Sequence, residues 1–300
     1  MSLHPTPVRH DMARGVTFLL AAYLLFTGMN ALAKLLGGAY PVLELMFFRN
    51  LAALLPVGIL LARMGGLRAL RTARPFGHAA RATTALLAMF ANYWSVVRLP
   101  LGDAIALGNT MPLFVTILAI PMLGERVGVH RWSAVVVGFA GMLLIAMGLG
   151  AFGSGPVPLL AVAAAASHGL FAAGSQLLVR QLSATEASAT IVAWQSILLA
   201  AACGLALPFI WVTPSPGDLA LMILMGICGG LGQFLMTQAY AHAEASAIAP
   251  WTYSGVVWAI FAGWLIWGDV PTPLMLAGAA VVAASGVYIL HRERIRRRAA

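Results

Sequence analysis

Ten apolar runs, each about 20 residues long, occupy almost the whole of this 300-residue sequence. A helix rises about 1.5 Å per residue and the hydrocarbon core of a bilayer is about 30 Å thick, so each run predicts a membrane-spanning helix. Short gaps rich in Gly, Pro or Arg predict the turns between them. The predicted spans are residues 13–36, 41–62, 78–98, 103–122, 131–149, 157–179, 187–209, 217–240, 246–267 and 272–290. The sequence therefore predicts an all-α polytopic membrane protein with ten transmembrane helices.

The composition argues against a soluble domain. Only 9% of the residues are charged, whereas soluble domains average roughly 25%, so the chain cannot cover a water-facing surface. The net charge of +9 does not indicate a nucleic-acid partner, because most Arg residues lie in short gaps or in the tail 291–298. Cys203 and Cys228 both lie inside apolar runs, so we expect no disulfide, no metal site and no cofactor.

The distribution of Lys and Arg predicts which side of the membrane each loop faces, since cytoplasmic loops are enriched in both residues. With the N-terminus in the cytoplasm, 15 of the 18 Lys and Arg residues, Arg81 among them, fall in cytoplasmic segments, and Arg98 falls outside. Lys34 and Arg49 lie within predicted spans. We expect both termini in the cytoplasm of a bacterium, with the chain in the inner (plasma) membrane. We expect no cleavable signal peptide, because the first apolar run is too long for one.

The two halves of the chain resemble each other at a displacement of about 143–145 residues. Residues 104–106 match residues 247–249, and Gly124 matches Gly268. A half with five spans crosses the membrane an odd number of times, so the second half must enter from the opposite face. This predicts two inverted five-helix repeats, a plan common in secondary transporters. The predicted repeats are residues 1–150 and 151–300.

These features resemble a known family. The ten spans, the repeat, and the segments 123–126 and 267–271 look like the drug/metabolite transporter superfamily, and its EamA branch in particular. The run 34–50 is similar to the start of many bacterial members. The resemblance implies a transporter and not an enzyme, in a group that includes amino acid exporters of the YddG type. Other members carry riboflavin, S-adenosylmethionine or nucleotide sugars, and the fold does not separate these substrates.

Polar and aromatic residues inside the spans are the candidates for a substrate site, because polar groups in a bilayer core face the bundle interior. Several recur at steps of three and four, which places them on one helix face. The alternatives are a seam of hydrogen bonds for the first span, a packing role for His168, and interface anchoring for each Trp. The residues expected to line a cavity are Tyr23, Thr27, Asn30, Asn92, Tyr93, Asn109, His168, Gln233, Thr237, Trp251 and Trp258.

Three charged residues in the first two spans carry separate predictions. Lys34 and Glu44 lie at similar distances before and after the first predicted turn, so we expect an ion pair, either structural or as an outer gate. Arg49 lies near the middle of the second span, about 140° around the helix from Glu44, and does not share its face. The family that the sequence resembles often has an Arg at this position whatever the substrate, so the resemblance implies that Arg49 is a structural tie. A bidentate contact to a substrate carboxylate is the alternative.

The expected function is secondary transport of small amphipathic metabolites by alternating access. Amide, hydroxyl and aromatic groups with few fixed charges suit a zwitterion with an apolar side chain, so export of neutral or aromatic amino acids is the leading hypothesis. Uptake of a vitamin or a nucleotide-like metabolite is the alternative. An intramembrane enzyme is a remote one, because Glu44, Glu244 and Asp269 lie near the ends of spans. We expect a small-molecule substrate and membrane lipid as partners, and a monomer or weak dimer.

Overall fold

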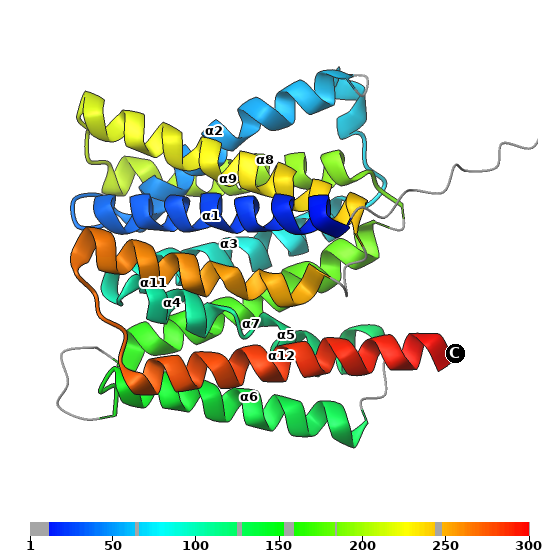
Figure 1. The fold of residues 1–300 in the computed structure, drawn as a ribbon. Helices are drawn as coiled ribbons and strands as arrows, with labels where there is room; N and C mark the ends of the chain where they lie inside the picture. The colour runs from blue at the N-terminus through cyan, green and yellow to red at the C-terminus, as the bar shows by residue number, and fades with distance from the viewer. Residues whose placement is uncertain are drawn as a thin grey trace, which may run out of the picture.

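The computed structural model describes residues 12–63, 66–124, 128–152, 159–183, 185–243 and 248–299, and the regular secondary structure in these residues is helical. In this part of the chain the helices form ten spans, so the predicted all-α polytopic fold is confirmed. Figure 1 shows the helices lying side by side with short connections. The elements are α1 (Met12–Leu36), α2 (Val42–Arg63), η1 (Gly66–Leu70), α3 (Pro75–Arg98), α4 (Leu101–Gly108), α5 (Met111–Leu123), α6 (Val129–Gly148), α7 (Leu159–Leu182), α8 (Ser188–Ile210), α9 (Pro216–His242), η2 (Ala249–Tyr253), α11 (Ser254–Trp267) and α12 (Pro273–Ala299).

Within the described ranges, eight helical segments are long and apolar enough to cross a bilayer, with α4 and α5 counted together. The other two spans are α3 and the segment formed by η2 and α11. α3 contains Arg81 and Arg98, whose charges lower its hydropathy. α11 has 14 residues because a 3-10 turn precedes it.

Two spans are interrupted at corresponding places in the two halves. In the first half, Asn109 and Thr110 separate α4 from α5, and in the second half η2 leads into α11. Both interrupted spans end at a glycine in the left-handed conformation, Gly124 with φ of 66° and Gly268 with φ of 71°. Glycine adopts this conformation without the steric cost that a Cβ brings. The matching helix ends agree with the repeat that the sequence predicts.

The contacts between helices follow the two-fold relation that an inverted repeat implies. If α1, α2 and α3 correspond to α7, α8 and α9, the contact of α1 with α9 should be mirrored by one between α3 and α7, and both exist. The contact of α2 with α9 is mirrored likewise by α3 with α8. The pairs α2–α8, α4–α11 and α6–α12 join each helix to its own counterpart. In Figure 1, α6 and α12 lie side by side at one edge of the bundle.

The α6–α12 pair approaches closely because each helix presents a glycine to the other. A Cβ added to Gly278 would lie 2.5 Å from the carbonyl oxygen of Gly141. A Cβ added to Gly141 would lie 2.9 Å from the carbonyl oxygen of Gly278. Small residues let helix backbones meet in this way inside a membrane, where packing contacts drive helix association.

The bundle has two ends, which we name by their charge. The basic end holds the α2–α3 connection with Arg71 and Arg74, the end of α7 with Arg180, and the C-terminus. The opposite end holds the connections 37–41, 99–100, 211–215 and 268–272. Figure 1 shows the C-terminus at one end of the bundle and the α1–α2 and α11–α12 connections at the other.

Candidate substrate cavity

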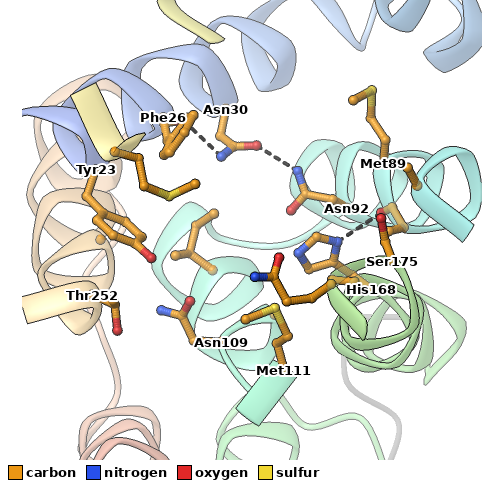
Figure 2. Close-up of a pocket in the computed structure, with 18 of the residues that line it drawn as sticks. Tyr23, Phe26, Asn30, Met89, Asn92, Asn109, Met111, His168, Ser175 and Thr252 are labelled. Carbon is orange, nitrogen blue, oxygen red and sulfur yellow. Dashed lines mark hydrogen bonds between the residues drawn. The ribbon is translucent and has the colours of Figure 1, made fainter. Parts of the chain in front are cut away.

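A cavity of about 980 Å³ lies between the two halves of the bundle. Its wall comes from α1, α3, α4 and α5 of the first half and from α7, α8, α9, η2, α11 and α12 of the second. Figure 2 shows amide, imidazole and phenol groups of Asn30, Asn92, Asn109, His168 and Tyr23 converging on one space. Cavities of about 300–1,000 Å³ accommodate drug-sized ligands, so this one has room for a metabolite larger than a single amino acid.

The structure brings eight of the predicted residues together in the wall of this cavity. Helix periodicity explains their convergence, since polar groups on one face of each span turn away from lipid. That these residues contact a substrate stays a prediction. The eight are Tyr23, Thr27, Asn30, Asn92, Tyr93, Asn109, His168 and Gln233.

Two predicted residues whose side chains the structure describes, Trp251 and Trp258, are not found in the wall. Trp251 is 45% exposed, and Trp258 does not border the cavity, so placing them there was wrong. The 3-10 turn η2 changes the periodicity from 3.6 to about 3 residues per turn, and Thr252 and Tyr253 face the cavity instead. The side chain of Thr237 lies outside the described residues.

Two asparagines tie α1 to α3 across the cavity wall. The side-chain amide of Asn92 donates to Oδ1 of Asn30 at 2.8 Å, and the amide of Asn30 donates to the carbonyl oxygen of Phe26 at 2.9 Å. In Figure 2 the side-chain oxygen of Asn92 points toward the open space. The pair therefore orients a hydrogen-bond acceptor that a ligand can reach.

His168 and Asn109 form the neighbouring part of the wall. Nδ1 of His168 lies 2.9 Å from the carbonyl oxygen of Ala88, so Nδ1 carries the proton and the neutral ring keeps Nε2 as an acceptor. This bond joins α7 to α3, as the packing alternative from the sequence requires. Nδ2 of Asn109 is buried and has no hydrogen-bond partner among the described residues. Buried polar groups in native proteins nearly always have a partner, so this unpartnered amide beside the cavity is a candidate donor for a ligand.

Several residues of the wall were not predicted. Arg81, which the sequence analysis counted among the cytoplasmic segments, lies on α3, is 8% exposed and borders the cavity. Tyr253 of η2 and Gln195 of α8 also border it. On α7, Ser175 and Gln176 follow His168 at steps of seven and eight, a helical stripe that the sequence contains.

Arg49 lies behind the wall. Its Nη1 donates to Oδ1 of Asn50 at 3.0 Å, and its Nε is buried without a hydrogen-bond partner in the described part of the chain. A Cβ added to Gly229 of α9 would lie 3.1 Å from that Nε, so the guanidinium packs against this helix. The position agrees with a structural tie between α2 and α9.

Lys34 does not pair with Glu44, so the predicted ion pair is wrong. Nζ of Lys34 lies 3.3 Å from Oδ2 of Asp269 and donates to the carbonyl oxygen of Leu99 at 2.8 Å. Nζ also lies 4.8 Å from the centre of the Trp267 ring, a cation–π contact. We call Lys34, Asp269, Trp267 and the Leu99 carbonyl the Lys34 cluster. It joins α1, the α3–α4 connection and the end of α11 at the opposite end of the bundle.

Glu44 faces the other way around α2, which explains the failed prediction. Its Oε2 accepts a hydrogen bond from the backbone N–H of Val212 at 3.1 Å, in the α8–α9 connection. Nearby, the Tyr40 hydroxyl donates to Oδ2 of Asp218 at 2.7 Å, and this bond raises the pKa of Tyr40. Equal depth in the membrane therefore did not decide which residues meet, because the direction around the helix axis differs.

At the basic end, a second carboxylate joins the α7–α8 connection to the α2–α3 connection, as Glu44 joins the start of α2 to the α8–α9 connection. Oε1 of Glu186, in the α7–α8 connection, accepts hydrogen bonds from Thr72 Oγ1 at 2.6 Å and from the backbone N–H of Ala73 at 3.3 Å. We call the hydrogen bond from Val212 to Glu44 the Glu44 tie, and those from Thr72 and Ala73 to Glu186 the Glu186 tie. The two ties occupy corresponding places in the two repeats. The α2–α8 side of the bundle is therefore joined by a carboxylate at both ends.

The cavity extends toward the basic end and is closed at the opposite end. Its wall includes Val179, three residues before the end of α7 at Leu182. Toward the opposite end, Val96, Leu99 and Leu101 are buried in one apolar cluster, and the Lys34 cluster lies beside them. Apolar packing and an ion pair therefore separate a solute in the cavity from the opposite end of the bundle.

Comparisons with known proteins cover nearly the whole chain. The sequence model of the EamA-like transporter family matches residues 13–147 and again residues 156–291. A riboflavin transporter from Rhizobium johnstonii is 32% identical over 95% of this chain and 93% of that protein. The pseudopaline exporter CntI of Pseudomonas aeruginosa is 30% identical over 93% of this chain and 97% of that protein. An S-adenosylmethionine uptake transporter from Rickettsia bellii is 27% identical, with 93% and 94% covered.

The fold also matches a solved crystal structure. The TM-score is 0.64 at 18% sequence identity, and the match covers 94% of this chain and 99% of that chain. At this identity the likeness shows the fold alone.

Proposed function

Because the chain belongs to the EamA-like transporter family, we propose that it is a secondary transporter that carries a mid-sized organic metabolite by alternating access. The observation that carries the proposal is the cavity of about 980 Å³ between the two repeats. Secondary transporters with inverted repeats bind their substrates at the repeat interface near the bilayer midplane. Amide groups of Asn92 and Asn109 would orient the substrate, and Tyr23, Tyr93 and Tyr253 would contact its rings or apolar parts.

The conformation described above corresponds, in this proposal, to a state open toward the cytoplasm. The excess of Lys and Arg at the basic end favours a cytoplasmic location for that end. Opening to the other side then requires separation of the Lys34 cluster and of the apolar layer around Leu99 and Leu101. The Glu44 and Glu186 ties need not break, so we propose that the repeats rock about the α2–α8 side.

The size of the cavity favours a vitamin-sized or nucleoside-sized substrate. Among the similar proteins, the riboflavin and S-adenosylmethionine transporters support such a substrate, and the pseudopaline exporter supports transport out of the cell. Export of neutral or aromatic amino acids is the second candidate. The combination of carboxamides and tyrosine rings in the wall favours it, since these groups suit a zwitterion with an aromatic side chain.

Counterflow in proteoliposomes tests the proposal. The purified chain is reconstituted with an internal pool of riboflavin, S-adenosylmethionine, phenylalanine or leucine, and entry of the same radiolabelled solute is followed. We expect saturable accumulation of at least one solute above that in protein-free vesicles. Accumulation of phenylalanine or leucine alone would favour the second candidate. Accumulation of none would contradict transport of these classes.

A further inference from the structure

Arg81 places a fixed positive charge in the cavity. Among the described residues of the wall it is the one side chain that is always charged, and no Asp or Glu borders the cavity there. Nη1 of Arg81 donates to the carbonyl oxygen of Ile191 at 2.9 Å, and Nε is buried without a described partner. A charge taken out of water costs several kcal/mol unless a counter-charge compensates it. Arg81 therefore has unused capacity for an anion.

One described acidic side chain at this end, Glu186, is already engaged. Glu186 accepts hydrogen bonds from Thr72 and Ala73, and no ion pair joins it to Arg81 in the described structure. His78, one turn before Arg81, has neither ring nitrogen bonded to a described residue and lies against the ring of Trp194 at 5.8 Å. Neither residue neutralises the guanidinium.

Neutral hydrogen-bond donors on the adjacent helices share the cavity wall with Arg81. Gln195 lies one turn after Ile191 on α8, and both Arg81 and Gln195 border the cavity. Ser175 and Gln176 border it from α7, which packs against α3. Carboxamide N–H and hydroxyl groups beside a guanidinium form a donor set that matches the oxygens of a carboxylate or a phosphate.

We infer that Arg81, with Gln195 and the α7 polar pair, binds an anionic group of the substrate, a carboxylate or a phosphate, in the part of the cavity nearest the basic end. The inference rests on the proposed function, because it names the substrate class of the same cavity. The side-chain amides of Asn92 and Asn109 then contact the rest of the substrate. A cationic solute is disfavoured, since no acidic residue of the described wall offsets the charge of Arg81.

Charge-selective modification tests this without a known substrate. Ala172 of α7, which borders the cavity, is replaced by Cys after Cys203 and Cys228 have been changed to Ala. The rates of reaction with a sulfonate-bearing and a trimethylammonium-bearing methanethiosulfonate are compared. The sulfonate-to-ammonium ratio should fall about tenfold with Arg81→Gln and be retained with Arg81→Lys, because a positive charge in the same cavity attracts the sulfonate and repels the ammonium.

The control position is Val270, an exposed residue at the opposite end, where Val270→Cys should give a ratio that Arg81→Gln does not change. An unchanged ratio at position 172, or an equal change at position 270, would overturn the inference. If Arg81→Gln does not fold, the wild-type Arg81 background serves instead. The ratio at position 172 should then fall as ionic strength rises, and a flat response would overturn the inference.

Protection identifies the anionic group. Benzoate, phenyl phosphate and benzamide share one ring and differ in the head group, so each is tested for slowing modification of Ala172→Cys. Protection by benzoate or phenyl phosphate that Arg81→Gln removes supports the site and tells carboxylate from phosphate. Equal protection by benzamide, or no protection by either anion, contradicts it. Because these readouts need no transport, a failed counterflow experiment would reject the proposed function and leave the anion site standing.

Discussion

The Lys34–Asp269 pair should control the opening of the opposite end of the cavity. At 3.3 Å the Coulomb attraction is about 5 kcal/mol at an effective dielectric constant of about 20, before desolvation is subtracted. The Lys34 and Asp269 side chains are 13% and 30% exposed, which lies between an exposed pair and a buried pair. Exposed pairs contribute about 0.2–1 kcal/mol, and breaking a buried pair costs about 3–5 kcal/mol. We therefore expect Asp269→Asn to destabilise the closed end by about 1–2 kcal/mol.

The assay measures access to the cavity from outside the cell. Ile105→Cys provides a thiol in the wall on α4, and a membrane-impermeant maleimide is added to intact cells that express the Cys203→Ala, Cys228→Ala background. A change of 1–2 kcal/mol corresponds to about a 5–30-fold shift in the ratio of open to closed molecules. The rate of labelling should rise by that factor with Asp269→Asn.

A double-mutant cycle gives the result that would refute the reasoning. Lys34→Met and Asp269→Asn should be non-additive by about 1–2 kcal/mol, because the two side chains are in contact. Lys34→Met and Glu44→Gln form the matched control and should add, because Glu44 bonds to Val212 instead. Unchanged labelling with Asp269→Asn, or coupling of Lys34 to Glu44 alone, would show that the Lys34 cluster does not hold this end closed.

Three further predictions concern packing, ionisation and topology. Gly278→Ala should lower the free energy of unfolding in detergent by about 1–3 kcal/mol, because the added Cβ would meet the Gly141 carbonyl oxygen. Gly28→Ala is the control and should have no such effect, because its Cβ would have no atom within 4 Å. Equal effects of the two substitutions would contradict the packing. Because Asp218 raises the pKa of Tyr40, the stabilising hydrogen bond should be complete below the ordinary tyrosine pKa of about 10 and be lost as pH rises through the raised value. Tyr40→Phe should remove that pH dependence in thermal unfolding between pH 8 and about 11, and an unaltered profile would argue against the bond. A C-terminal epitope should be labelled in inverted vesicles and not in intact cells, and the reverse pattern would contradict a cytoplasmic basic end.

Much of the fold and part of the cavity follow from local physical rules. A bilayer requires each apolar run to be a helix that satisfies its own backbone, so the spans can be located from sequence. Polar residues at helical spacing must turn inward, and this placed Asn30, Asn92 and Gln233 in one wall. The α4–α5 break falls at Asn109 and Thr110, which are poor helix formers followed by Pro112.

The remaining features depend on contacts between distant segments. Arg81 lies near the start of α3, where an Arg is typical of a cytoplasmic anchor, and its partner is a carbonyl group 110 residues away on α8. Lys34 meets Asp269, which is 235 residues away in the sequence. Trp251 was misplaced because the α-helical pattern was extended through η2. Helical periodicity predicts how deep in the membrane a residue lies and which face of its helix it occupies. It does not predict which other helix packs against that face.

Substrate flux through Asn92 variants tests the central account, transport through the cavity between the repeats, most directly. Asn92→Ala removes both the bond to Asn30 and the acceptor that points into the cavity, so flux per folded molecule should fall about tenfold or more while the melting temperature changes little. Phe209→Ala, at a residue of α8 that is 89% exposed, is the matched control and should retain wild-type flux. If Asn92→Ala lowers yield and melting temperature but keeps the flux of each folded molecule, the cavity is not the route.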